Sequence, residues 1–99
     1  MNLENSRNEI DNIDRHIVEL LNRRAEIALN IGGIKAKAGI PVFDRRRESE
    51  VMRAVLRSSD GTFGGEAMER VFSEILLESR RLQRCVGQLA AARHVENSK

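Results

Sequence analysis

The chain has 99 residues, with 17 basic and 15 acidic side chains, a net charge of +2 and a pI near 9.2. This length excludes more than one domain, so we expect a single domain over residues 1–99. The mixed, mildly basic charge argues against a dedicated nucleic-acid binder and suits small acidic ligands.

Cysteine usage and hydropathy indicate the compartment. Cys85 is the only cysteine, which rules out an intrachain disulfide and fits a reducing environment. No apolar run approaches the roughly 18 residues that a membrane helix needs. The N-terminus, Met1 to Asn5, lacks a signal-peptide pattern. We therefore expect a cytoplasmic protein with no membrane partner.

The first predicted helix covers residues 7–38. Ser6 and Glu9 have the spacing of a capping box, which places the N-cap at Ser6. Gly32 and Gly33 lie inside this helix and cost it roughly 1.5–2 kcal/mol relative to alanine. Because the apolar pattern continues beyond them, we expect the helix to continue and another backbone or a ligand to approach closely there. The alternative is a helix that bends or frays at this point.

One face of this helix is apolar at alternating spacings of three and four residues. Its members are Ile10, Ile13, Ile17, Leu20, Ile27, Ile31, Ile34 and Ala38. Arg24 lies in the middle of this apolar face, where an unpaired charge is very costly, so it must meet a partner or an anion. The helix would be about 50 Å long, whereas a compact chain of this size is roughly 25–30 Å across. A second copy is the simplest cover, so we expect a homodimer.

Two more helices follow. Gly39 and Pro41 end the first helix, and Asp44 caps a second helix over 44–58. A loop rich in Gly and Ser leads to a third helix over 66–92, and the polar tail from about Arg93 is expected to fray. No strand is predicted. The predicted fold class is therefore all-α, with one long, one short and one medium helix.

Charged residues occupy faces that should be apolar. Lys35 follows Arg24 by eleven residues, almost three turns, so the two cations share one face about 16 Å apart and leave room for a small molecule. The inward face of the second helix begins with Asp44, Arg47 and Glu48. The competing interpretation is that these three residues form an ordinary cap and ordinary helix-end pairs.

The third helix carries Ser79 and, one turn later, Gln83 on its apolar face. A helical serine can satisfy itself by bonding its own i−4 carbonyl, so Ser79 alone indicates little. A buried glutamine needs partners for both its oxygen and its nitrogen. Together the three helices predict a cationic pocket inside a helical bundle. His16 and His94 lack partners at ligand spacing, so we expect no metal site.

Four spaced motifs resemble the all-helical chorismate mutases of the AroQ class. They are Asn22-Arg23-Arg24-Ala25-Glu26, Ile31-Gly32-Gly33-Ile34-Lys35, Ile40-Pro41-Val42-Phe43-Asp44 with Arg47-Glu48, and Glu78-Ser79-Arg80-Arg81-Leu82-Gln83. The resemblance covers about residues 3–88. It implies an intertwined homodimer of three-helix chains, an isomerase that converts chorismate to prephenate in aromatic amino acid biosynthesis without metal or cofactor. Gly33 departs from the polar residue that the family commonly has there.

The resemblance also implies a set of site residues, all but the first of which the helical pattern already indicates. They are Arg7, Arg24, Lys35, Asp44, Arg47, Glu48, Ser79 and Gln83. Arg7 rests on the resemblance alone and would come from the other subunit.

Each of these residues has an expected role. Arg24 and Arg7 would hold the substrate carboxylates, with Arg47 nearby. The catalytic residues would be Arg24, Lys35 and Gln83, the last two at the ether oxygen, together with Glu48, which would accept from the substrate hydroxyl. Asp44 and Ser79 would assist at the rim.

Other functions compete with this one. Isochorismate-pyruvate lyases and aminodeoxychorismate mutases share the fold, and Asp44 and Gln83 weakly favour chorismate mutase over them. A non-enzymatic dimerisation or regulatory module, or a nucleic-acid binder using Arg45 to Arg47, is disfavoured because the unusual polar residues face inward. Docking to another enzyme of the shikimate pathway stays open.

Overall fold

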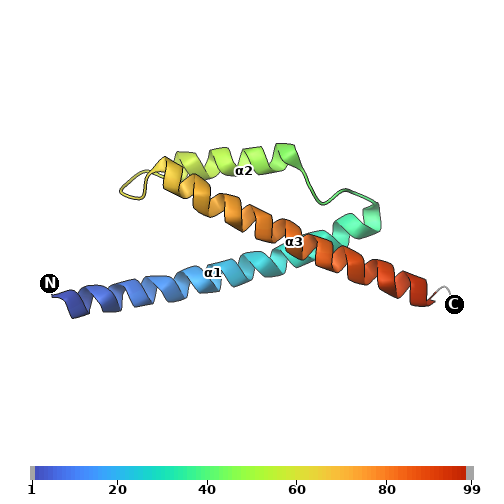
Figure 1. Cartoon of the computed structure of the whole chain (residues 1–99), viewed down its shortest axis with the longest axis horizontal. Coiled ribbons are helices and arrows are strands. Elements are labelled where there is room, and N and C mark those ends of the chain that lie inside the picture. The colour runs from blue at the N-terminus through green and yellow to red at the C-terminus, as the bar shows by residue number, and fades with distance from the viewer. Residues whose placement is uncertain (1, 98–99) are drawn as a thin grey trace.

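The chain forms three α-helices in a computed structural model that describes the backbone of residues 2–97 and the side chains of residues 2–89. They are α1 (Leu3–Ala38), α2 (Arg45–Ser58) and α3 (Gly65–Asn97), shown in Figure 1. The predicted all-α chain with three helices is therefore confirmed. No helix in this part of the chain is long and apolar enough to cross a bilayer.

The N-terminus of α1 differs from the prediction. The helix begins at Leu3, four residues early, and its N-cap is Asn2, whose side chain accepts from the Asn5 backbone N–H at 2.8 Å. The predicted cap at Ser6 is wrong, because Ser6 lies inside the first turn and its own N–H donates to the Asn2 carbonyl. Asparagine caps a helix as well as serine does, so the earlier residue adds a turn without loss.

The glycines of α1 lie where α3 crosses it. The helix continues through Gly32 and Gly33 and ends at Ala38, and its C-cap Gly39 adopts a left-handed φ of 68°. A Cβ on Gly32 would lie 2.7 Å from the backbone of Gln83, so a larger residue would force the two helices to shift apart. The predicted continuation and close approach of another backbone are confirmed at Gly32. At Gly33 the nearest neighbour would be the Val86 side chain at 3.7 Å, an ordinary contact.

The other helices have the following bounds. Asp44 caps α2 as predicted, with its carboxylate accepting from the Arg47 backbone N–H at 3.0 Å. The backbone of α3 stays helical to Asn97, five residues beyond the predicted end at 92, so fraying from Arg93 is not seen in the described backbone. Residues 89–92 are leucine and three alanines, which are strong helix formers.

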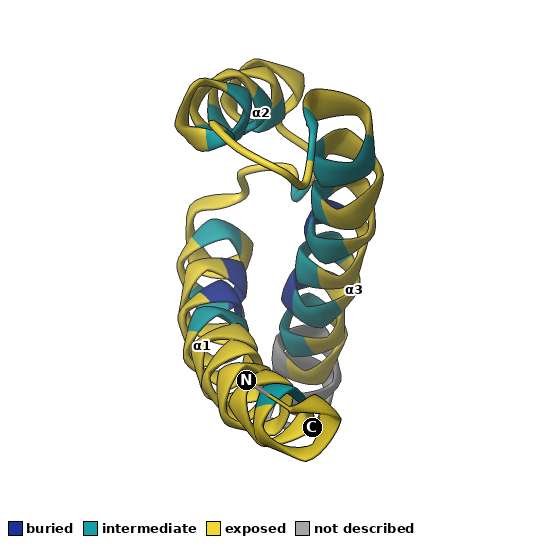
Figure 2. Cartoon of the chain, turned by 90° about the vertical axis from the view of Figure 1, so that its left-hand side faces the viewer, coloured by how far each residue is buried: buried dark blue, intermediate teal, exposed yellow. Residues whose placement is uncertain are grey.

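The helices are packed loosely around α3. It packs against both α1 and α2, while no Cα atom of α1 lies within 8 Å of a Cα atom of α2 in the described residues. The chain measures 66 × 28 × 14 Å with a radius of gyration of 17.9 Å, against about 13 Å for a compact domain of this length. Figure 2 shows the few buried residues on the facing sides of α1 and α3. Only Ala28 and Leu76 are buried apolar residues in the described part of the chain.

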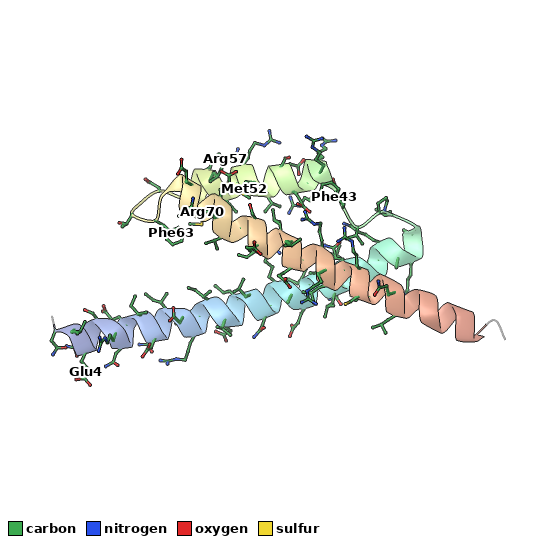
Figure 3. The ribbon with its side chains drawn as sticks, in the orientation of Figure 1. Glu4, Phe43, Met52, Arg57, Phe63 and Arg70 are labelled. Carbon is green, nitrogen blue, oxygen red and sulfur yellow. The ribbon has the colours of Figure 1, made fainter. Side chains whose placement is uncertain are left out.

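The N-terminal half of α1 extends away from the other helices. Figure 3 shows its side chains, around Glu4, projecting into open space on all sides. The apolar face predicted for this helix stays exposed there, at Ile10, Ile13, Ile17 and Leu20. A single chain therefore leaves half of its longest helix without an apolar partner.

Candidate active site

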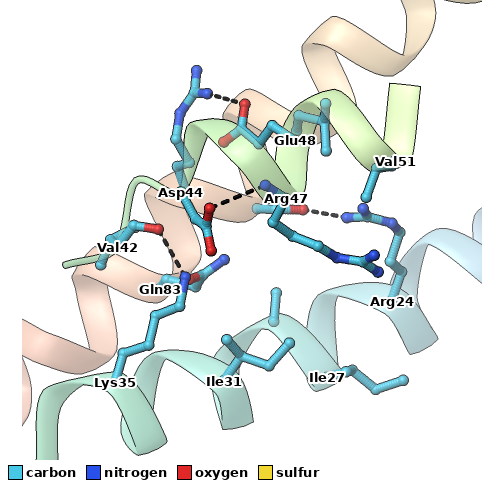
Figure 4. Close-up of a pocket in the computed structure, with 14 residues that line it drawn as sticks. Arg24, Ile27, Ile31, Lys35, Val42, Asp44, Arg47, Glu48, Val51 and Gln83 are labelled. Carbon is cyan, nitrogen blue, oxygen red and sulfur yellow. Dashed lines mark hydrogen bonds and ion pairs between the residues drawn. The ribbon is translucent and has the colours of Figure 1, made fainter. Parts of the chain in front are cut away.

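A pocket of about 350 Å³ lies where α1, α3 and the start of α2 meet. Its volume falls in the range of small-molecule sites. Seven of the eight predicted site residues line it: Arg24, Lys35, Asp44, Arg47, Glu48, Ser79 and Gln83. The residues that the sequence placed on three separate helices are thus brought together around one cavity (Figure 4).

Arg24 and Lys35 stand at the two ends of the α1 wall, with Ile27 and Ile31 between them (Figure 4). The Lys35 ammonium donates to the Val42 carbonyl at 2.8 Å, which occupies one of its three N–H groups. The α1 face therefore carries two cations separated by an apolar surface, as its sequence pattern predicts.

Arg24 meets a neutral partner. Its guanidinium donates to the Ser79 hydroxyl, which itself donates to the Ile75 carbonyl one turn earlier at 3.0 Å. The i−4 bond considered for this serine is therefore present, and it orients the Oγ lone pair toward Arg24. No described carboxylate lies within ion-pair distance of Arg24, so its charge remains available to an anion.

The start of α2 contributes three charged residues to the pocket, Asp44, Arg47 and Glu48. Asp44 both caps the helix and lines the pocket, so its role as a cap does not exclude the predicted role in the site. Figure 4 shows Arg47 reaching from α2 toward the side of the pocket that holds Arg24. Its guanidinium also lies 3.6 Å from the Glu50 carboxylate, and the side chain is largely exposed. An exposed pair of this kind is weak and is easily exchanged for a ligand.

Gln83 is the one buried polar side chain of the described residues, with 9% of its surface exposed. Its Oε1 atom has no hydrogen-bond partner there. Leaving a buried amide unpaired costs about 1–3 kcal/mol. Because the residue faces the pocket, a bound molecule can supply the missing partner.

Arg80 is the pocket residue that the sequence pattern did not indicate. Its guanidinium pairs with the Glu48 carboxylate at 2.5 Å, and both side chains are 22% exposed. It also lies over the Phe43 ring, 5.3 Å from the ring centre. A signal was present, because Arg80 precedes Gln83 by three residues and i,i+3 positions share a helix face. The apolar lining residues Val42, Val51 and Leu76 were likewise not predicted.

Arg7 does not line the pocket. It lies 17 residues before Arg24 on the same helix, which is about 25 Å along the axis. Its placement in a neighbouring subunit's pocket stays a prediction.

The lining has a clear electrostatic character. It carries four cations, Arg24, Lys35, Arg47 and Arg80, and two carboxylates, Asp44 and Glu48, for a net charge of two positive. No three His, Cys, Asp or Glu side chains gather as a metal site would require, as far as the described residues extend. Arginine forks arranged in this way recognise carboxylate or phosphate groups.

Comparison with known proteins identifies a family. The model of the family "Chorismate mutase type II" matches residues 6–84. A bifunctional chorismate mutase/prephenate dehydratase from Aquifex aeolicus is 41% identical over 78 residues, covering 75% of this chain and 22% of that protein. A protein of the same description from Neisseria gonorrhoeae is 36% identical over 79% of this chain. The chain thus spans about a fifth of the length of these curated relatives.

Two solved structures share the arrangement of helices. The crystal structure of chorismate mutase from Helicobacter pylori in complex with prephenate has a TM-score of 0.77 and 33% identity, covering 85% of this chain and 91% of that one. A conserved hypothetical protein from Pyrococcus furiosus has a TM-score of 0.69 and 41% identity, covering 82% of this chain and 93% of that one.

Proposed function

The chain belongs to the type II chorismate mutase family, and from that membership we propose that it is an isomerase converting chorismate to prephenate. The observation that carries the proposal is the pocket itself. Three helices bring seven predicted polar residues around one cavity of about 350 Å³. The product belongs to aromatic amino acid biosynthesis, and a protein with a single cysteine suits a cytoplasmic setting.

The charge of the pocket matches the substrate. Chorismate is a dicarboxylate, and the lining has a net charge of two positive. Arg24, whose only described polar contact is the neutral Ser79, can offer its fork to one carboxylate. Arg47 can exchange its exposed contact with Glu50 for the substrate.

The reaction is an intramolecular Claisen rearrangement, which needs neither a nucleophile nor a proton transfer. The protein must hold the compressed, chair-like conformer and stabilise negative charge that builds on the ether oxygen as the C–O bond breaks. We assign that oxygen to Lys35 and Gln83. The Val42 carbonyl fixes the Lys35 ammonium while leaving two N–H groups to donate, and Gln83, which lines the same pocket, can donate from its Nε2 amide group.

The substrate hydroxyl needs an acceptor. Glu48 lines the pocket and its second carboxylate oxygen, Oε2, is not engaged by Arg80. We therefore assign the hydroxyl to Glu48, with Asp44 and Ser79 at the rim.

We further propose that the active form is a homodimer. The exposed apolar face at Ile10, Ile13, Ile17 and Leu20 needs a cover that this chain does not provide. A second copy would cover it by pairing the two α1 helices. The partner subunit's Arg7 would then reach the pocket and hold the second carboxylate.

The proposal is tested by mixing the purified chain with chorismate, isochorismate and aminodeoxychorismate in separate reactions. Loss of the diene absorbance follows turnover, and the products are identified by NMR. We expect prephenate from chorismate. Pyruvate released from isochorismate would indicate a lyase instead, and no turnover of any of the three would leave only a non-enzymatic module.

A matched pair of variants tests the assigned ammonium. Lys35→Met should lower kcat about 10²- to 10³-fold, as expected when one donor to a developing oxyanion is removed. Lys37→Met removes an exposed lysine two residues later on α1 and should leave kcat unchanged. Circular dichroism of both variants checks that helical content is retained. Equal losses in the two variants would contradict the assignment of Lys35.

A further inference from the structure

The ion pair between Arg80 and Glu48 differs from every other pair in the described part of the chain. The remaining three, Arg46–Glu50, Arg47–Glu50 and Arg81–Glu78, join residues three or four apart on one helix. Arg80 and Glu48 instead join α3 to α2 across 32 positions of sequence. Because the backbone of α2 packs against α3 and not against α1 in the described residues, this pair connects the catalytic first turn of α2 to the helix on which it packs.

Arg80 is held on a second side as well. Its guanidinium lies over the Phe43 ring at 5.3 Å, a cation–π geometry. Phe43 directly precedes the Asp44 cap, so the ring belongs to the segment that starts α2. A guanidinium bonded to a carboxylate and stacked on a ring has little freedom to rotate away.

The pair determines what Glu48 can do in the pocket. Arg80 engages Oε1, which leaves Oε2 as the acceptor for a ligand hydroxyl. It also neutralises Glu48, whose charge would otherwise attract the cations meant for the substrate. Arg24 instead contacts Ser79, and Lys35 contacts the Val42 carbonyl.

We propose that Arg80 is a positioning residue for Glu48, with Phe43 holding Arg80 in turn. The inference rests on the proposed mutase activity, in which Glu48 accepts from the substrate hydroxyl. Arg80 acts only through Glu48, so its contribution should vanish once the carboxylate is gone.

A double-mutant cycle on the full chain tests this. Steady-state kinetics with chorismate are measured for wild type, Arg80→Met, Glu48→Gln and the double variant. The amide introduced by Glu48→Gln still accepts a hydrogen bond but carries no charge, so residual turnover stays measurable. We expect Arg80→Met to lower kcat/KM about 10- to 100-fold in the wild-type background, as for a group displaced by about 1 Å. In the Glu48→Gln background, Arg80→Met should lower kcat/KM by less than about twofold.

Arg81→Met is the matched control. Arg81 is the next residue on α3 and also pairs with a glutamate, Glu78, but the pair is exposed and lies outside the pocket. Its removal should leave kcat/KM within about twofold of wild type, as expected for a surface ion pair. If Arg80→Met does not fold, as judged by circular dichroism, Arg80→Lys replaces it in the cycle, because lysine keeps the charge without the flat fork.

The outcomes separate the two proposals. Losses that multiply in the double variant would mean that Arg80 merely holds α2 in place, and would overturn the positioning role while leaving the mutase activity intact. An Arg81→Met loss as large as that of Arg80→Met would overturn it too. Absence of chorismate turnover by the wild-type chain would overturn both proposals.

Discussion

Gln83 differs from Lys35, the other residue assigned to the ether oxygen, because its side chain does not ionise. Figure 4 shows its amide at the same end of the pocket as Lys35, on the opposite wall. It is buried and lacks a partner for Oε1 within the described residues. An amide offers the same donors at every physiological pH. Its contribution to catalysis should therefore be independent of pH.

Replacing this amide by a carboxyl group should make activity depend on pH. In Gln83→Glu only the protonated carboxyl can donate to the ether oxygen, and the ionised form would repel the negative charge that builds there. Burial raises the pKa of such a carboxyl, while Lys35 opposes the rise. The protonated form exists below that pKa, so kcat should fall as pH rises through it. Profiles of kcat from about pH 5 to about pH 9 measure this.

The control is Gln88→Glu, which introduces the same group at an exposed position of α3. The kcat of Gln88→Glu should show the same pH profile as that of the wild type. In the wild type we expect Gln83 to cause no loss of kcat between about pH 6 and about pH 8. Parallel profiles for Gln83→Glu and the wild type would contradict the role assigned to Gln83.

Helical phase predicts most of the pocket because inward polar residues are anomalous on an apolar face. Arg24, Lys35, Ser79 and Gln83 stand out in this way within their own helices. Arg80 does not stand out, because its role depends on an ion pair with Glu48, which lies on another helix. A pairing across 32 positions depends on how two helices pack against each other. The periodicity within one helix carries no information about that packing.

The crossing of α1 and α3 brings two helix backbones into close contact. At Gly32 the backbone of one helix meets the backbone of the other, at Gln83. Gln83 also lines the pocket, so helix packing and the site share this residue. A glycine that costs about 1 kcal/mol of helix stability is retained here because only it permits the approach.

Alanine substitutions at the two adjacent glycines should have opposite effects. Gly32→Ala places a Cβ 2.7 Å from the Gln83 backbone and should destabilise the fold by about 1–3 kcal/mol. Gly33→Ala meets only the Val86 side chain at 3.7 Å and should stabilise it by up to about 1 kcal/mol. Urea unfolding followed by circular dichroism measures both, and equal free-energy changes would argue against backbone contact at Gly32.

The helix termini show where local signals are ambiguous. Asn2 and Ser6 are both good N-caps, and the structure uses the earlier one. Asp44 has no such rival nearby and was predicted correctly. The sequence therefore locates the start of a helix where only one good N-cap residue is present, as at α2. It does not where two compete, as at α1.

The described chain is elongated and buries little apolar surface within itself. It extends 66 Å in one direction and 14 Å in another, and only two apolar residues are buried among those described. Domains of this size ordinarily bury about two-thirds of their surface. The length of the apolar face predicted this shape, whereas the angle at which α3 crosses α1 could not be read from any one segment.

A charge placed on the exposed apolar face should disrupt association. Ile13→Glu should raise the dissociation constant of the homodimer at least about 100-fold, because an unpaired charge buried in an apolar interface costs several kcal/mol. Asn12→Glu adds the same charge to a neighbouring exposed polar position and should leave association intact. Sedimentation velocity over a concentration series distinguishes them. A wild-type chain that stays monomeric while turning over chorismate would contradict the dimer proposal.

The crossing at Gly32 can also be viewed mechanically, as a pivot with arms of unequal length. Along α1, Lys35 lies about 5 Å from this pivot, Arg24 about 12 Å and Arg7 about 37 Å, at 1.5 Å per residue. A tilt of about 5° would therefore move Lys35 by about 0.4 Å but Arg7 by about 3 Å. Lys35, which we assign to the ether oxygen of the breaking bond, is thus the site residue of α1 that such a tilt would displace least. If Arg7 binds in the site of a second copy, as we propose, contacts with that copy would be needed to hold it in place.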